Sequence, residues 1–459
     1  MMAAVARARH GGRAAIARAA LAGLALVLAS AAAACSPGAS SGAASGSPTG
    51  ATASAGATAE MPARRPIEMF SWWERVGAGD PLGALIKQHQ AAYPSDVIIN
   101  ASAGLSGLAR KTLRTRMSQR EPPDLFQANV GADLMQWVLI NRADALESKL
   151  LALDDILPAA DVAEWRRQMP KRLLDQVSFD GKMYGVPSNV HRINSIFYNR
   201  RVFDKYGLAV PTSVADFRGM ARKLKGTGVS LFAVGSKEPW TLALIAFESL
   251  LVSREGPTFY NDYLHGKLKP DDPRVLATLD VMLELGTYFN PDHYQRNWLQ
   301  AIELVVRGQA AMTPMGDWAS MFFNTQGMKN GQDYAEIAFP GSESTFVFTS
   351  DAFALPADAK NRAAAERLLE TIGSPAAQRA IALAKGALAP RADVQPDDSQ
   401  PIQAQKHALW QKGPLVLALS GIVPPRFSED LAVALAEMLN RRDPEPVIHT
   451  LRSRYALLK

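Results

Sequence analysis

Two adjacent tryptophans, Trp72 and Trp73, come at the end of the first alternating apolar segment of the chain, residues 67–72. Alternating apolar residues predict a strand, and neighbours in a strand point to opposite faces. One indole therefore projects at the strand end, where ligand sites of α/β proteins tend to lie. Its ring could pack against the apolar C–H face of a sugar while polar groups meet the hydroxyls. In the alternative interpretation, both tryptophans are structural.

Amide side chains form a second candidate group. Gln127 and Asn129 follow a predicted strand at residues 124–126 and share one face at a spacing of two. An amide donates and accepts at once, which suits a hydroxyl, although such amides also order loops. Asn189 and His191 lie in a polar run between two predicted strands. They either line a cleft at this crossover or satisfy backbone groups there.

An acidic residue beside an aromatic one forms a third candidate. The apolar residues 310–315 predict a strand that ends at Gly316, followed by Asp317 and Trp318. Asp317 could cap the next helix, which is a common role for aspartate at this position. In the functional interpretation its carboxylate accepts from two sugar hydroxyls and Trp318 forms a wall beneath the ring.

The elements that must position these residues follow an α/β alternation. After the first strand we expect a helix at 82–93, a strand at 97–99, a helix at 108–118, a strand at 124–126 and a helix at 133–140. Strand-like segments at 184–187 and 193–198 lie close together, and the alternation then restarts. Further helices are predicted at 241–251, 274–288, 298–306, 361–372, 375–384, 429–439 and 446–457. A chain of 459 residues fits two such domains with a cleft between them.

The N-terminus has the composition of an export signal. Residues 1–34 contain four arginines, no acid and an apolar stretch before Cys35. The preceding Ala32-Ala33-Ala34 resembles the lipobox of a bacterial lipoprotein, so we expect Cys35 to be lipidated; the alternative is an ordinary secretory signal with an incidental cysteine. The Ser-, Gly- and Ala-rich residues that follow, to about residue 65, predict a flexible tether.

Charge and cysteine content exclude several classes of function. Without the four N-terminal arginines, 46 of the 50 Lys and Arg remain against 44 Asp and Glu, which disfavours nucleic acid as a partner. Because Cys35 is the single cysteine, the body offers no thiolate nucleophile, no disulfide and no thiolate metal ligand. The seven histidines show no metal-ligand spacing, so no cofactor is expected.

Several separated motifs occur in a specific order along the chain. These motifs are Phe70-Ser71-Trp72-Trp73, Pro122-Pro123-Asp124 with Phe126-Gln127, Val186-Pro187 with Asn189 and His191-Arg192, and Met315-Gly316-Asp317-Trp318. Supporting stretches lie at 266–269, 305–311 and 350–356. The series resembles the family 1 extracellular solute-binding proteins of ABC importers, above all their glucose/mannose-binding branch, from residue 67 to the C-terminus.

The resemblance implies a two-lobed, hinged periplasmic-binding-protein fold of type II, of the α/β class, with a ligand cleft between the lobes. It places residues 66–190 and 351–400 in lobe 1 and residues 191–350 and 401–459 in lobe 2. It further implies a monomeric, non-enzymatic receptor that captures a glucose- or mannose-like monosaccharide by hinge closure. The receptor would be exported, held at the periplasmic side of the envelope by its lipid anchor alone, and would deliver the sugar to the transmembrane subunits of an ABC permease.

The resemblance also implies which residues meet the ligand. Matching positions that contact the hexose are Trp72, Trp73, Gln127, Asn129, Asp317 and Lys385, with Asn189 and His191 in the crossover and Trp240 as an aromatic of the second lobe. Ser420 stands where a histidine is expected, and the expected acid near residue 80 is Glu74, Asp80 or neither. These departures leave a disaccharide, a non-sugar solute or a glycan-processing enzyme as alternatives.

Overall fold

The computed structural model describes residues 65–73, 79–102, 106–138, 148–396 and 401–458. The chain separates into two compact units, residues 1–60 and 61–459, and every described residue belongs to the second. The predicted signal peptide, Cys35 and nearly all of the tether lie outside the described residues and stay predictions. None of the described helices is both long enough and apolar enough to cross a membrane.

A five-stranded sheet follows the order β2-β1-β3-β13-β6. Its strands are β1 (Ile67–Phe70), β2 (Ile98–Asn100), β3 (Leu125–Asn129), β6 (Val186–Pro187) and β13 (Asp351–Ala354). The first three are parallel, and β13 runs antiparallel between β3 and β6. The prediction that Gln127 and Asn129 follow a strand is wrong, because pairing with β13 extends β3 through both residues.

Two further sheets contain most of the remaining strands. The four-stranded sheet has the order β11-β8-β10-β9 and the three-stranded sheet has the order β14-β12-β7. Their strands are β7 (His191–Arg192), β8 (Ser195–Asn199), β9 (Ser230–Phe232), β10 (Ala310–Pro314), β11 (Tyr334–Ala338), β12 (Phe346–Thr349) and β14 (Leu415–Leu417). A two-stranded ribbon joins β4 (Ser178–Phe179) to β5 (Lys182–Met183).

Helices surround these sheets. Those before residue 240 are α1 (Pro81–Ala92), α2 (Ser106–Ser118), α3 (Ala132–Met135), η2 (Leu153–Asp155), α4 (Ala159–Gln168), α5 (Lys171–Leu174), α6 (Arg200–Tyr206) and α7 (Asp216–Leu224). Those up to residue 330 are the π-helical η3 (Leu242–Phe247), α8 (Glu248–Leu264), α9 (Pro273–Gly286), η4 (His293–Gln295), α10 (Trp298–Val306) and α11 (Ala319–Thr325). The last are α12 (Arg362–Gly373), α13 (Pro375–Lys385), α14 (Pro401–Lys412), α15 (Leu419–Ile422), α16 (Pro425–Arg441), α17 (Glu445–Arg454) and η5 (Tyr455–Leu458).

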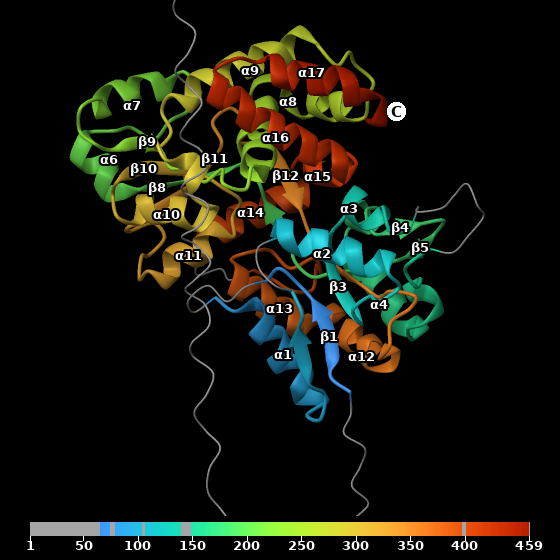
Figure 1. The fold of residues 1–459 in the computed structure, drawn as a ribbon. Helices are drawn as coiled ribbons and strands as arrows, with labels where there is room; N and C mark the ends of the chain where they lie inside the picture. The colour runs from blue at the N-terminus through green and yellow to red at the C-terminus, as the bar shows by residue number, and fades with distance from the viewer. Residues whose placement is uncertain (1–64, 74–78, 103–105, 139–147, 397–400, 459) are drawn as a thin grey trace, which may run out of the picture. The chain divides into compact units, whose positions relative to one another are not determined.

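The apolar side chains form two separate cores, which define two lobes. One core lies under the five-stranded sheet, where α1, α12 and α13 pack (Figure 1). The other lies around the four-stranded sheet and the helices α8, α9, α16 and α17, which Figure 1 shows gathered together. Each core buries one face of a sheet against helices, as the α/β pattern predicts. The two-lobed α/β fold predicted from the sequence is confirmed.

Two chain segments pass between the lobes side by side. β6 pairs with β13 in the first sheet, and a few residues further β7 pairs antiparallel with β12 in the three-stranded sheet. The chain thus leaves one lobe near residue 190 and returns near residue 350. Trp410, within the 401–459 segment assigned to lobe 2, packs in the first core with Phe346 and Phe348. The precise division of the chain into lobes stays a prediction.

Candidate functional site

A cavity of about 260 Å³ is lined by residues of both lobes. Five of the eight tryptophans of the chain take part in this aromatic cavity. They are Trp72, Trp73, Trp240, Trp298 and Trp318. Tryptophan presents a large, rigid ring that packs well against apolar surfaces while its N–H can donate. A cavity with so many indoles suits a guest that has flat apolar faces.

The first-lobe wall places the two adjacent tryptophans in different roles. Trp73 is buried and donates from Nε1 to the Asp351 carboxylate at 3.1 Å, while its ring edge meets Phe353. Trp72 is half-buried, and the Arg110 guanidinium lies 4.9 Å from its ring centre. The side chain of Trp73 is therefore fixed by the protein, and Trp72 offers the more open ring.

Asp351 fixes several side chains of this wall. Its Oδ2 accepts from the Lys385 ammonium at 2.5 Å and from the Asn189 amide at 2.8 Å, in addition to Trp73. Lys385 also lies 4.7 Å from the Trp73 ring centre. Burial alone would raise the pKa of Asp351, but the Lys385 ammonium together with the donors around it holds that pKa well below its usual range. Asp351 is thus ionised and Lys385 is its counter-ion.

His191 and Asp317 form a second buried group at the junction of the lobes. The His191 Nδ1 atom lies 2.5 Å from Asp317 Oδ1, and His191 Nε2 lies 3.3 Å from the Asn189 amide nitrogen. Lys406 donates to Asp317 Oδ2 at 2.8 Å. Burial lowers the pKa of His191, so the ring is neutral, donates from Nδ1 and accepts at Nε2.

Asp317 does not line the aromatic cavity in this structure. Its side chain is fully buried, and both oxygens are used by His191, Lys406 and the Arg192 amide. The alternative role as helix cap is not observed either, since α11 starts after Trp318 with no side-chain cap. Burial would raise the pKa of Asp317, but Lys406 and His191 lower it. Contact between this carboxylate and a sugar is therefore contradicted by this geometry.

The other predicted residues divide between the cavity and the wall behind it. Asn129, His191, Trp240 and Lys385 line the cavity together with Trp72 and Trp73. Gln127 is fully buried and accepts from Ser71, while Asn189 is fully buried and bound to Asp351, so neither side chain reaches the cavity. Gln127 lies behind the wall because its position in β3 turns it into the first lobe, which corrects the prediction of a ligand contact.

The second-lobe wall is made by one face of η3 and α8 with two further tryptophans. Trp240, Leu244 and Glu248 recur at a spacing of four, which brings them to one side of the helix. Trp318 packs its edge against His191, with ring centres 5.2 Å apart. A Cβ on Gly316 would lie 2.2 Å from the Trp318 ring, so glycine is required there for the indole to fold back.

Several lining residues were not predicted from the sequence. These are Arg110, Glu248, Trp298, Thr349, Asp351, Ser420 and Glu429, while Trp318 was named only as a wall beneath Asp317. Ser420, at the position of the expected histidine, does line the cavity. Asp80 instead caps α1 by accepting from the Gly83 amide at 2.7 Å, and Glu74 lies outside the described residues.

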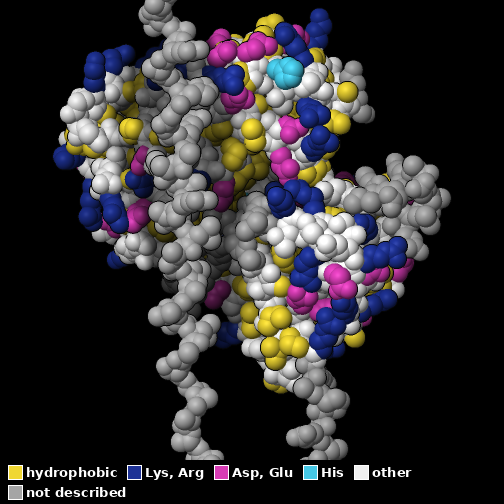
Figure 2. Space-filling model, viewed as in Figure 1, with side chains coloured by type: hydrophobic (Ala, Val, Ile, Leu, Met, Phe, Trp, Pro, Cys, Tyr) yellow, Lys and Arg dark blue, Asp and Glu magenta, His cyan; other side chains and the backbone are white. Residues whose placement is uncertain are grey.

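The charged residues of the cavity are paired. Lys385 pairs with Asp351, Arg110 lies 3.1 Å from Asp133, and Glu429 lies 2.9 Å from Arg114. On the face of the molecule drawn in Figure 2, basic and acidic side chains are likewise interspersed. Within the described part of the chain, no cluster of three His, Cys, Asp or Glu residues could hold a metal ion. The cavity therefore has no net charge to attract an ionic solute.

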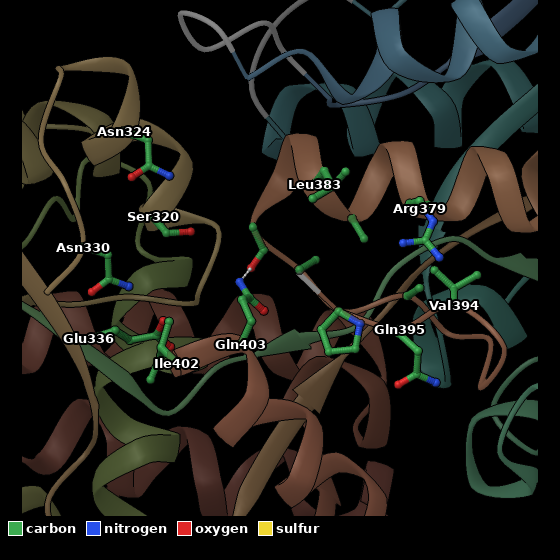
Figure 3. A pocket seen from close by; sticks show the side chains of 15 residues that line it. Ser320, Asn324, Asn330, Glu336, Arg379, Leu383, Val394, Gln395, Ile402 and Gln403 are labelled. Atoms are coloured by element: carbon green, nitrogen blue, oxygen red, sulfur yellow. Dashed lines mark hydrogen bonds between the residues drawn. The ribbon is translucent and has the colours of Figure 1, made fainter. Parts of the chain in front are cut away.

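A second cavity, of about 390 Å³, lies elsewhere on the chain (Figure 3). Ser320, Asn324 and Asn330 face Arg379, Leu383 and Val394 across it, and Gln403 donates to the Gly386 carbonyl at 3.0 Å. It contains no tryptophan and none of the predicted site residues. It also borders residues 397–400, which the structure does not describe. We therefore base the candidate site on the aromatic cavity.

A two-lobed α/β fold with a ligand-sized cavity lined by both lobes defines a solute-binding protein of the periplasmic type. The family described as bacterial extracellular solute-binding protein matches residues 84–379. The chain belongs to this family, whose members serve transport and are not enzymes. Because the family is extracellular, the protein is exported.

Individual relatives agree with this assignment. An uncharacterized ABC transporter extracellular-binding protein of Pyrococcus horikoshii is 33% identical over 82% of this chain and 84% of its own length. The xylose/arabinose-binding protein XacG of Haloferax volcanii is 24% identical over 80% of this chain and 77% of its own length. Among solved structures, the bacterial solute receptor AcbH has a TM-score of 0.71 at 20% identity, covering 85% of this chain and 97% of its own.

Proposed function

We propose that the protein is the sugar receptor of an ABC importer and binds a neutral monosaccharide of the glucose or mannose type. The observation that carries this proposal is the set of five tryptophans from both lobes around one cavity whose charges are paired. Pyranose rings have apolar C–H faces that indoles cover well. A cavity without an unpaired charge gives no advantage to an anion or a cation.

The mechanism follows from the division of the cavity between lobes. The first lobe offers Trp72 and Asn129, and the second offers Trp240 and Trp318. A sugar held by both sets favours the closed form over the open one, because only the closed form makes both sets of contacts. The permease then receives the sugar from this closed form, while a lipid on Cys35 keeps the monomeric receptor at the membrane.

The relatives support a sugar but not one particular sugar. They include xylose/arabinose-binding, glucose-binding and multiple sugar-binding proteins, and the solute receptor AcbH is described as preferring β-D-galactopyranose exclusively. Relatives named only as probable sugar-binding periplasmic proteins are 28% identical over 73% of this chain. We place D-glucose and D-mannose first, with a disaccharide as the alternative.

Titration calorimetry against a panel tests the proposal. The panel contains D-glucose, D-mannose, D-galactose, D-xylose, L-arabinose and maltose, with spermidine and sulfate as charged controls. We expect one monosaccharide to bind tightest and the charged controls to give no heat. Maltose binding far tighter than any monosaccharide would replace the monosaccharide assignment, and tight binding of spermidine or sulfate with no sugar binding would refute the sugar proposal.

A further inference from the structure

Glu248 is a fully buried carboxyl group that lines the aromatic cavity. Its Oε2 accepts from the Tyr260 hydroxyl at 2.9 Å and from the Leu419 amide at 2.7 Å. Its Oε1 has no hydrogen-bond partner among the residues that the structure describes. One oxygen of this carboxyl is thus held by the protein, and the other is left for a different partner.

An unpartnered buried oxygen is costly, about 1–3 kcal/mol for a neutral group, and native proteins rarely leave one without a reason. The apolar neighbours Trp240 and Leu244, on the same helix face, give Oε1 no alternative partner. The π-helical segment η3 ends immediately before Glu248. Such segments are rare and occur frequently at functional sites, which is consistent with a helix shaped to present this side chain.

The position of the proton decides what Glu248 can do. Both donors from the protein point to Oε2, which leaves Oε1 as the oxygen that carries the proton. Burial raises the pKa of Glu248 to about 8, although the Leu419 amide and the Tyr260 hydroxyl act against this. At neutral pH the group is therefore a neutral acid with an O–H on Oε1.

Other titratable groups do not change this assignment. Tyr260 on α8 is the titratable neighbour in contact, and burial raises its pKa far above neutral pH. From α15 and β14, the groups nearby are the Leu419 amide and the Leu417 carbonyl, which accepts weakly from Tyr260. The remaining charged or titratable residues around the cavity are Arg110, Asp351, Lys385 and Glu429, which are paired, and the neutral His191.

We propose that Glu248 is the hydrogen-bond donor that the second lobe presents to the sugar, through the O–H on Oε1 to a hydroxyl or ring oxygen of the guest. The inference rests on the proposed sugar function and adds a specificity-determining residue to it. A guest that offers an acceptor oxygen at this position is favoured, and one that offers only C–H there is disfavoured.

Two variants separate the donor role from mere space filling. In Glu248→Gln the carboxamide oxygen can still accept from Tyr260 and Leu419 while Nε2 donates to the guest. In Glu248→Leu the donor is lost at similar volume. With the tightest-binding sugar of the panel at pH 7, we expect Glu248→Gln to stay within about threefold of the wild type and Glu248→Leu to bind about tenfold more weakly. Thermal unfolding without sugar checks that each variant folds.

The pH dependence and substituted sugars test the direction of the hydrogen bond. Wild-type affinity should fall as the pH rises through about 8, where Glu248 loses its proton, and Glu248→Gln should show no such fall. Monodeoxy analogues of the same sugar identify the position involved, because one of them weakens binding to the wild type but not to Glu248→Leu. A deoxyfluoro group at that position, which accepts but cannot donate, should restore part of the affinity.

The outcomes separate this inference from the function on which it rests. If the wild type binds a sugar and Glu248→Leu binds it equally well, the donor role is refuted while the sugar function stands. Affinity that rises above pH 8 would make Glu248 an acceptor and overturn the inference as well. If the wild type binds no sugar of the panel, the proposed function fails and the inference fails with it.

Discussion

The Lys385 ammonium lies 2.5 Å from Asp351 Oδ2, and the same oxygen accepts from the Trp73 indole. One carboxylate therefore orients both a cation and a ring on the first-lobe wall of the cavity. Both partners of the ion pair are buried, with side-chain exposures of 9% for Lys385 and 7% for Asp351. Removing one charge of such a pair leaves the other uncompensated, which is costly.

Asp351→Asn should therefore destabilise the protein by about 3–5 kcal/mol, measured as the free energy of unfolding in urea. The amide keeps the shape of the side chain but leaves the Lys385 charge without a counter-ion. Asp175→Asn is the matched control, because Asp175 pairs with Lys171 on the surface, with side-chain exposures of 50% and 86%. This control should change stability by less than about 1 kcal/mol. Equal losses in both variants would contradict a buried ion pair at Asp351.

Tryptophan fluorescence should report sugar binding, since five of the eight indoles line the cavity. Trp318→Ala should weaken binding about tenfold or more, because a half-buried ring of the second-lobe wall is lost. Trp165→Phe serves as the control, because Trp165 is buried in the first core, away from the cavity. Unchanged affinity in Trp318→Ala would remove this ring from the binding site.

Much of the fold followed from local pattern. The alternation of strands and helices predicted the two lobes, and the predicted helix at 298–306 matches α10. The ends of elements were harder to predict, because partners distant in sequence decide them. β3 continues through Gln127 and Asn129 only because β13, more than two hundred residues later, pairs with it. Nothing near residue 127 indicates that partner.

The site shows the same contrast between local and distant information. Trp72, Trp73 and Trp240 lie at the cavity and carry a recognisable chemical type. Asp317 was predicted to face the cavity, but Lys406, 89 residues further along the chain, takes one of its oxygens. Glu248 gave no local signal, because a glutamate in a helix is ordinary until burial is known. Its function depends on Tyr260 and Leu419.

His191 should stay neutral at a pH where an ordinary histidine protonates. Burial lowers its pKa, so the folded protein binds fewer protons than the unfolded chain, whose histidines titrate near 6.5. The unfolding free energy therefore falls as the pH drops below about 6.5. In ¹⁵N-histidine spectra we expect the resonances of His191 to keep the pattern of the neutral Nδ1–H form at pH 6.5. A half-protonated pattern at that pH would contradict the assigned tautomer.

Lys406 decides the charge state of this group, which leads to a final prediction. Its ammonium is fully buried between Asp317 Oδ2 at 2.8 Å and the Gly386 carbonyl at 3.1 Å. Burial acts to lower the pKa of Lys406, but the carboxylates of Asp317 and Glu336 raise it, so the group is charged. In Lys406→Met the carboxylate of Asp317 loses this counter-ion, and His191 becomes the remaining group that can supply a positive charge.

We therefore expect the pKa of His191 to rise in Lys406→Met, so that its ring is protonated at pH 6.5 in the variant and neutral in the wild type. Lys406→Arg keeps the charge and is the control, in which His191 should remain neutral. The same ¹⁵N-histidine spectra provide the measurement. If His191 stays neutral in Lys406→Met, Asp317 has taken the proton instead, and the ion pair with Lys406 would not be what holds the imidazole neutral. A His191 that responds to Lys406 in this way couples α14 to the wall of the cavity through Asp317.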